Sequence, residues 1–115
     1  MARRIDVLLV NDCEEAGRAL ADSLRGRVGV RVATGLRDAV DELVRQVPDA
    51  IVCNVELPPY RGDVLLSMVA REHPEVRRIL WLGARAVVDC LDVAHVTLPP
   101  EAGVADLLRA IDDED

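Results

Sequence analysis

The residues best placed for chemistry stand directly after two apolar runs. Asn11 and Asp12 follow the run IDVLLV, and Asn54 ends the run AIVCN, with Glu56 two residues further along. Short apolar runs bounded by turn residues are typical of strands that are buried on both faces. Ligands bind at the carboxyl ends of parallel strands in open α/β sheets, so these four side chains are the first candidates for a site.

Two of these four side chains are amides, and this limits the chemistry. The Asn54 amide has no anionic oxygen with which to attack a substrate. Mg²⁺ prefers carboxylate oxygens, and Asp12 and Glu56 leave too little charge to bind it well once Asn11 and Asn54 are neutral. We therefore expect no catalytic residue, no metal and no cofactor here.

Helical patterns alternate with the strands that position these residues. Strands are predicted over residues 5–10, 28–33, 50–54 and 78–83, with a fifth ending at Leu98. Helices are predicted from Glu14, from a cap at Thr34 to Pro48, from Gly62 to His73 and from Pro100 onward. Only residues 85–91 remain for the fourth helix, so we expect it to be short or irregular. The pattern predicts an α/β fold, one domain over residues 1–115, with an open parallel five-stranded sheet in the order 2-1-3-4-5 and helices on both faces.

Residues 48–84 resemble the middle of a two-component response-regulator receiver domain. Leu57, Pro58, Gly62 and the strand 79–82 match the family pattern in order, and Asn54 stands where that family has its phospho-accepting aspartate. The resemblance implies the flavodoxin-like receiver fold.

The positions that do chemistry in receivers differ in this chain. The two acidic magnesium ligands of the family correspond to Asn11 and Asp12, and its hydroxyl residue after the fourth strand corresponds to Gly83. Leu98 replaces the lysine that neutralises the phosphoryl group. The resemblance therefore implies a degenerate pocket around Asn54, formed by Asn11, Asp12, Glu56, Gly83 and Leu98.

Receivers also place a cis proline after the lysine position, so the resemblance implies a cis bond before Pro99. Their aromatic switch residue corresponds to His95. A short fourth helix would leave apolar residues poorly covered, and exposed apolar patches commonly mark interfaces. The candidate interaction face is formed by Val87, Val88, Leu91 and His95.

Several of these residues also have a purely structural interpretation. Asn54 would satisfy backbone groups at the end of its strand. Asp12 would cap the first helix, and Cys13 would be a packed thiol. His95 would be a partly buried strand residue. The three cysteines have no metal-type spacing, and we expect no disulfide.

Composition excludes some classes of function. The chain has 115 residues, 50% of them hydrophobic and 30% charged, which predicts a globular domain. A net charge of −7 argues against binding nucleic acid or an anionic membrane. Without an apolar run of bilayer length or a signal peptide, we expect a cytoplasmic protein.

Two classes of function remain open. The first is a phosphorylation-independent pseudo-receiver, which is not an enzyme and acts as a signalling or scaffolding module that binds a protein partner of unknown identity, with a homodimer left open. The second is a small enzyme or cofactor-binding domain of flavodoxin-like fold. Against it, the residues after the first strand lack the glycines and hydroxyls that cradle a phosphate. A receiver detached from an output domain is a third alternative.

Overall fold

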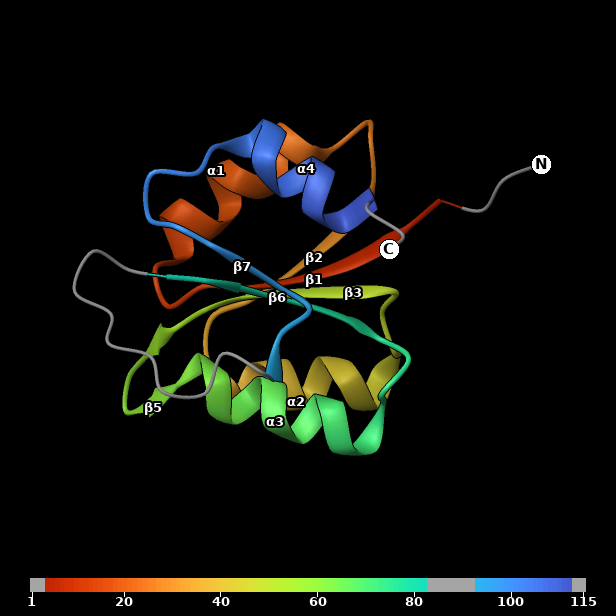
Figure 1. Ribbon diagram of the computed structural model, residues 1–115, viewed down its shortest axis with the longest axis vertical. Helices are drawn as coiled ribbons and strands as arrows, with labels where there is room; N and C mark the ends of the chain where they lie inside the picture. Colours follow the sequence, from red (N-terminus) through yellow and green to blue (C-terminus); the bar gives the residue numbers. More distant parts are fainter. Residues whose placement is uncertain (1–3, 83–92, 113–115) are drawn as a thin grey trace.

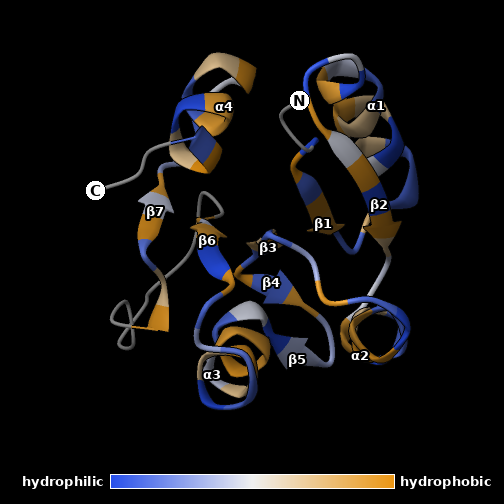
Figure 2. Ribbon diagram, turned by 90° about the vertical axis from the view of Figure 1, so that its right-hand side faces the viewer, coloured by the Kyte–Doolittle hydropathy of each residue, from blue (hydrophilic) through white to orange (hydrophobic). Residues whose placement is uncertain are grey.

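A sheet of five parallel strands lies between two layers of helices (Figure 1). The structure is a computed structural model, and it describes residues 4–82 and 93–112. Helices α1 (Glu14–Leu24) and α4 (Val104–Asp112) cover one face, and α2 (Leu36–Arg45) and α3 (Gly62–Glu72) cover the other. Figure 2 shows the same two layers after a quarter turn. Both faces of the central strands are therefore shielded from water.

The strands follow the predicted order. They are β1 (Asp6–Val10), β2 (Gly29–Ala33), β3 (Ala50–Asn54), β6 (Arg77–Trp81) and β7 (Val96–Leu98). Their order is β2-β1-β3-β6-β7, and every neighbouring pair is parallel. The first four residues of β3 are fully buried, as its apolar run predicts. The carboxyl ends of β1 and β3 consequently lie side by side, which brings the residues that follow them together.

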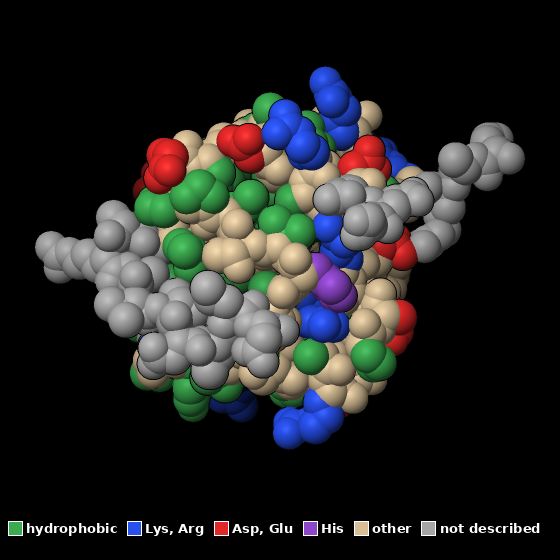
Figure 3. Space-filling model, in the orientation of Figure 1, with side chains coloured by type: hydrophobic (Ala, Val, Ile, Leu, Met, Phe, Trp, Pro, Cys, Tyr) green, Lys and Arg blue, Asp and Glu red, His purple; other side chains and the backbone are tan. Residues whose placement is uncertain are grey.

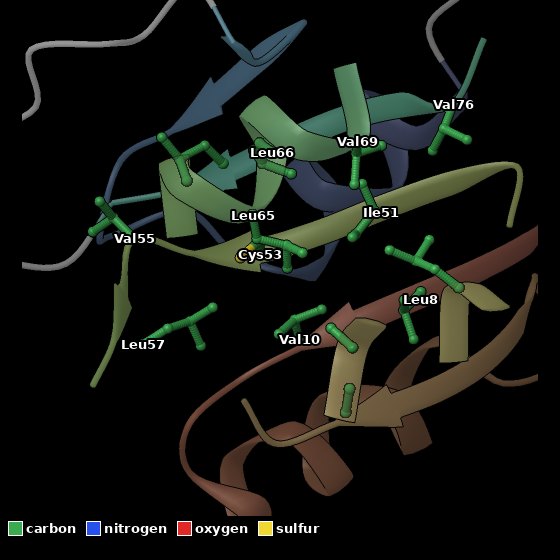
Figure 4. Packing of buried hydrophobic residues seen from close by; sticks show 14 residues of the cluster. Leu8, Val10, Ile51, Cys53, Val55, Leu57, Leu65, Leu66, Val69 and Val76 are labelled. Atoms are coloured by element: carbon green, nitrogen blue, oxygen red, sulfur yellow. The ribbon is translucent and has the colours of Figure 1, made fainter. Parts of the chain in front are cut away.

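Residues of β1 alternate between two hydrophobic clusters because successive strand side chains point to opposite faces. Leu8 and Val10 pack with residues of α2 and α3, and Val7 and Leu9 pack with residues of α1 and α4. Figure 4 shows the first cluster, in which Ile51 and Cys53 of β3 face Leu65, Leu66 and Val69 of α3. The sheet is thus held from both sides, and its carboxyl edge is fixed in place.

Two predicted helix starts are wrong. Gly35, not Thr34, is the N-cap of α2, and the Thr34 backbone N–H donates to the Asp38 carboxylate at 3.0 Å. Helix α4 begins at Val104 and not at Pro100, because Pro100 lies in a turn that the Ala102 N–H closes on the Pro99 carbonyl oxygen at 3.1 Å. The predicted fourth helix, residues 85–91, lies outside the described residues.

A small hairpin follows β3 and was not predicted. Strands β4 (Glu56–Leu57) and β5 (Tyr60–Arg61) pair antiparallel around Pro58 and Pro59. Among the described residues the cis peptide bond lies between these two prolines. The expected cis bond before Pro99 is wrong: that bond is trans, the form that X-Pro bonds intrinsically favour, and the turn from Pro99 to Ala102 redirects the chain instead.

Gly62 allows the hairpin to return to the end of β3. Its N–H donates to the Val55 carbonyl oxygen at 2.7 Å. A methyl group at this position would overlap the Asn54 carbonyl oxygen and lie 2.9 Å from the Cys53 sulfur. The glycine is therefore needed for close approach to the backbone that carries Asn54. In the described ranges, no helix is long and apolar enough to span a bilayer.

Candidate functional site

A pocket of about 300 Å³ opens at the carboxyl edge of the sheet. It is lined by Asn11, Ala16, Leu20, Asn54, Glu56, Trp81, Leu82 and Pro100. Three of the predicted site residues, Asn11, Asn54 and Glu56, thus come together. Asp12 and Leu98 are not among the lining residues, and Gly83 lies outside the described residues.

Asn11 lines this pocket, and its side-chain oxygen is hydrogen-bonded to the backbone. Its Oδ1 accepts a hydrogen bond of 2.9 Å from the Cys13 backbone N–H, which closes a local turn before α1. Its own backbone N–H donates to the Ala33 carbonyl oxygen at 3.0 Å, and only 8% of the residue is exposed. No fully enclosed side-chain nitrogen or oxygen in the described ranges lacks a partner, so the unbonded Nδ2 of this lining residue is accessible to a ligand or to water.

Asn54 and Glu56 have unused polar groups. Asn54 is half-buried and pairs with Trp81 across the sheet, and its side-chain amide makes no hydrogen bond with any described residue. The expectation that this amide satisfies backbone groups is therefore wrong. The Glu56 side chain is exposed and forms no ion pair within residues 4–82 and 93–112. Both groups are free to meet a ligand or water.

The residues present do not suit Mg²⁺, which the resemblance would place in this pocket. A hard cation prefers carboxylate oxygens, and Asn11 and Asn54 offer only neutral amide oxygens, the first of which also accepts a hydrogen bond from the Cys13 N–H. Asp12 is exposed and outside the lining set, so Glu56 is the one carboxylate among the described lining residues. In the described part of the chain no group of three His, Cys, Asp or Glu side chains is arranged to hold a metal ion.

Asp12 does not cap the first helix either. The N-cap of α1 is Cys13, and no side chain there bonds to the free N–H groups of the first turn. The turn closed by Asn11 puts Cys13 at the N-cap, and α1 begins at Glu14, as the sequence predicted. Cys13 itself is exposed, so the expectation of a packed thiol is wrong for it.

Leu98 is turned away from the pocket chemistry. It is 6% exposed and packs in the cluster beneath α1 and α4. A cationic side chain at this position would have to leave that cluster to reach a ligand. The leucine therefore adds to the hydrophobic core.

Trp81 is a wall residue that was not among the predicted site residues, and it also packs against the core beneath α1 and α4. Its Nε1–H donates to the Pro99 carbonyl oxygen at 3.0 Å, which fixes the indole at the edge of the pocket. Its register opposite Asn54 could have been inferred from the strand alignment alone. Ala16 and Leu20 of α1 complete the apolar side.

His95 lies directly before β7 and is exposed, so the expectation of a partly buried strand residue is wrong. Its Nδ1 accepts a 2.9 Å hydrogen bond from the Arg78 backbone N–H, and the backbone N–H of His95 donates to the Arg78 carbonyl oxygen at 2.8 Å. Desolvation of the part of the ring that contacts the chain, together with the charges of Arg78 and Arg77, lowers the pKa of His95. The other members of the candidate face, Val87, Val88 and Leu91, lie outside the described residues.

Cys53 is buried behind the site as a structural thiol. Burial, reinforced by the nearby Asp63 carboxylate, raises the pKa of this thiol well above its ordinary value. It therefore stays protonated and unreactive in the native protein. Cys90 lies outside the described residues.

The strand order and the helices on both faces are those of response-regulator receiver domains, and the chain has this fold. A crystal structure of a response regulator receiver protein from Pseudomonas putida matches with a TM-score of 0.86 at 23% identity, covering 99% of this chain and all of that one. The signal receiver domain of an HD domain-containing protein from Pseudomonas fluorescens Pf-5 matches with a TM-score of 0.82, also at 23% identity, over 95% of this chain and 92% of that one.

Curated relatives are longer than this chain. A protein-glutamate methylesterase/protein-glutamine glutaminase of Dechloromonas aromatica is 25% identical over 118 aligned residues, covering 95% of this chain and 33% of the relative. The regulatory protein LuxO of Vibrio vulnificus is 38% identical over 58 residues, covering 50% of this chain and 12% of the relative. The chain thus spans a third or less of these two relatives. No protein-family model matches the chain.

Proposed function

We propose that the chain is a phosphorylation-independent pseudo-receiver, a signalling or scaffolding module that binds a protein partner and is not an enzyme. The observation that carries this proposal is the orientation of Asn11. Its oxygen is bonded to the Cys13 backbone and its amide nitrogen is left for the pocket. A pocket built to hold Mg²⁺ needs an acceptor at this place, and here it has a donor.

The surroundings of Asn54 support the same conclusion. Phosphoryl transfer depends on positioned positive charge, supplied by a metal ion and cationic side chains. No Lys or Arg is found among the described residues that line the pocket, and Leu98 is buried in the core. Asn54 also lacks the anionic oxygen that a nucleophile needs. Three features therefore oppose phosphoryl transfer to position 54. They are the absence of a nucleophilic oxygen on Asn54, the absence of a cationic side chain among the described lining residues, and an amide in place of a carboxylate at Asn11.

The partner surface is proposed near the edge strand β7. Figure 3 shows hydrophobic side chains gathered between α4 and β7 on the face toward the viewer. Val96 and Val104 are partly buried hydrophobic residues of these elements. Partly exposed apolar side chains beside an edge strand suit a protein partner, because binding removes their remaining accessible surface from water. His95, at the start of β7, belongs to the same candidate face.

Trp81 provides a direct measurement of metal binding. It is the only tryptophan and forms a wall of the pocket, so its fluorescence reports on an ion beside Asn54. We expect no saturable change when the wild-type protein is titrated with Mg²⁺ into the millimolar range. The variant that combines Asn11→Asp and Asn54→Asp regains two carboxylates and should respond, which makes it the matched positive control. Saturable binding to the wild-type protein would contradict the proposal.

A further inference from the structure

The exposed large hydrophobic residues of the described part of the chain all lie on one layer of the molecule. They are Val44, Val47, Tyr60 and Val64, located on or next to α2, α3 and the hairpin. The α1 and α4 layer has none among its described residues. Val44 is 82% exposed in the last turn of α2, where a polar residue would serve solubility better. This asymmetry is unexplained by the pocket or by the β7 edge.

A groove lies beside Val44. It has a volume of about 330 Å³, and its walls come from α2 and α3, with Val40 and Leu43 on one side and Met68 and Val69 on the other. Its lining is mostly apolar, with Glu72 as the one acidic residue among the described ones. Val44 thus protrudes at the rim of an apolar groove that is large enough to receive a side chain of similar size from a partner.

The charges on the exposed side of α2 alternate in sign. Asp41 and Arg45 are one helical turn apart, on the surface that flanks Val44. Asp41 makes no hydrogen bond or ion pair with any described residue. Arg45 pairs with Glu42 at 3.1 Å, but Glu42 is already paired with Arg31 at 3.0 Å. Arg45, with 74% of its side chain exposed, can therefore leave Glu42 without leaving that carboxylate unpaired.

We propose that α2 is a self-association surface that pairs antiparallel with α2 of a second copy across a two-fold axis near Leu43. In this arrangement Asp41 faces Arg45 of the second copy, and Val40 faces its Val47. The midpoint of each pair along the sequence lies at or just after Leu43, so a single two-fold axis at that level of the helix relates both pairs. Each Val44 then lies beside the groove of the other copy. A two-fold interface requires a surface that is complementary to itself, and this surface is complementary in charge and in hydrophobicity.

A second copy of this chain is the partner, because the charges and apolar residues of α2 are complementary to those of the same helix running in the opposite direction. The interface is small, so the dimer is weak and depends on concentration. This inference goes beyond the proposed function and does not rest on it, because it involves neither the pocket nor the β7 edge. A receiver that accepted phosphate could equally carry such a surface.

Sedimentation equilibrium of the whole chain over micromolar to millimolar concentrations tests the proposal. We expect the wild-type mass to rise toward twice that of the chain, and Val44→Glu to remain a monomer. Asp41→Arg places two arginines opposite two arginines, and Arg45→Asp places two aspartates opposite two aspartates. Each single variant should therefore weaken self-association at least about tenfold. An equimolar mixture of the two variants should form a heterodimer, because opposite charges then face each other again.

The heterodimer distinguishes this surface from loss of folding or from another interface. Asp22→Arg on α1 makes the same change of charge at an exposed aspartate on the other layer, so it is the control and should leave the mass unchanged. A wild-type protein that stays monomeric at millimolar concentration would overturn the proposal. So would a dimer that persists in Val44→Glu, a dimer that Asp22→Arg disrupts, or a mixture of the charge variants that does not associate.

Discussion

A single amide nitrogen determines what the pocket can bind. Aspartate at position 11 could accept the Cys13 N–H with one oxygen and offer the second oxygen to a cation. Asparagine accepts the same hydrogen bond at 2.9 Å and offers Nδ2 instead. The local backbone geometry is therefore compatible with either residue, and only the chemistry facing the pocket is reversed. Under the proposed function, this one change keeps the local fold and removes a carboxylate from the pocket.

The charge state of one histidine should also be measurable. We expect the pKa of His95 to lie below the 6.5 of an unperturbed histidine, because desolvation disfavours the charged ring and protonation would place a cation near Arg78 and Arg77. Protonation would also break the hydrogen bond that Nδ1 accepts. The unfolded chain then binds the proton more readily than the native protein. The contribution of His95 to stability is therefore complete above pH 6.5 and is lost as the pH falls through the folded pKa.

Two measurements check this prediction. The imidazole proton shifts in an NMR titration give the pKa of His95 directly. Urea unfolding midpoints between about pH 7.5 and 5.5 should fall less in His95→Gln than in the wild-type protein, because the variant has lost this titrating group. A His95 pKa at or above 6.5 would show that the Arg78 hydrogen bond is not formed in solution.

At the scale of elements, periodicity predicted the regular structure well. The strand order and the central strand Ala50–Asn54 were predicted because buried strands and amphipathic helices have distinct apolar spacing. Caps and turns were predicted poorly, since they depend on single hydrogen bonds. Asn11, and not Asp12, accepts the hydrogen bond that closes the turn before α1. The turn after Pro99 places the start of α4 at Val104.

The site was predicted in part for the same reason. Asn11, Asn54 and Glu56 could be placed together because parallel strands end at one edge. The direction of the Asn11 amide and the position of the Trp81 indole depend on bonds to Cys13 and Pro99 that no spacing rule contains. Leu98 was recognised as a missing lysine, but its burial in the core became visible only in three dimensions.

The link between the hairpin and α3 gives a test at this scale. Gly62→Ala would force a methyl group into the Asn54 carbonyl, so we expect a loss of about 3 kcal/mol or more in the free energy of unfolding. Gly29→Ala in β2 is the matched control, because its added methyl would meet only an ordinary contact at 3.6 Å. Urea denaturation of both variants measures the difference. Equal stabilities would show that the hairpin does not pack against β3 as described.

In the whole molecule, the residues that stabilise the fold are largely different from those at the positions where receivers carry out phosphoryl transfer. The residues that fold it into a receiver are apolar runs, helix faces and Gly62, and these are all present. The positions that would hold a metal and a phosphoryl group are occupied by Asn11, Asn54 and Leu98. Solved receiver domains at 23% identity or below share this fold with TM-scores of 0.80 and above. Conserving the core thus does not require conserving the chemistry, because the two sets of residues hardly overlap.

The central claim is that the pocket does not take a phosphoryl group, and intact mass measures this most directly. Wild-type protein and Asn54→Asp are incubated with acetyl phosphate and Mg²⁺, and the masses are recorded. We expect no adduct on the wild-type protein, because the Asn54 amide cannot attack. We expect little on Asn54→Asp, because Asn11, Gly83 and Leu98 leave too little positive charge around the transferring group. A stable gain of about 80 Da, one phosphoryl group, mapped to Asn54 of the wild-type protein would contradict the pseudo-receiver account.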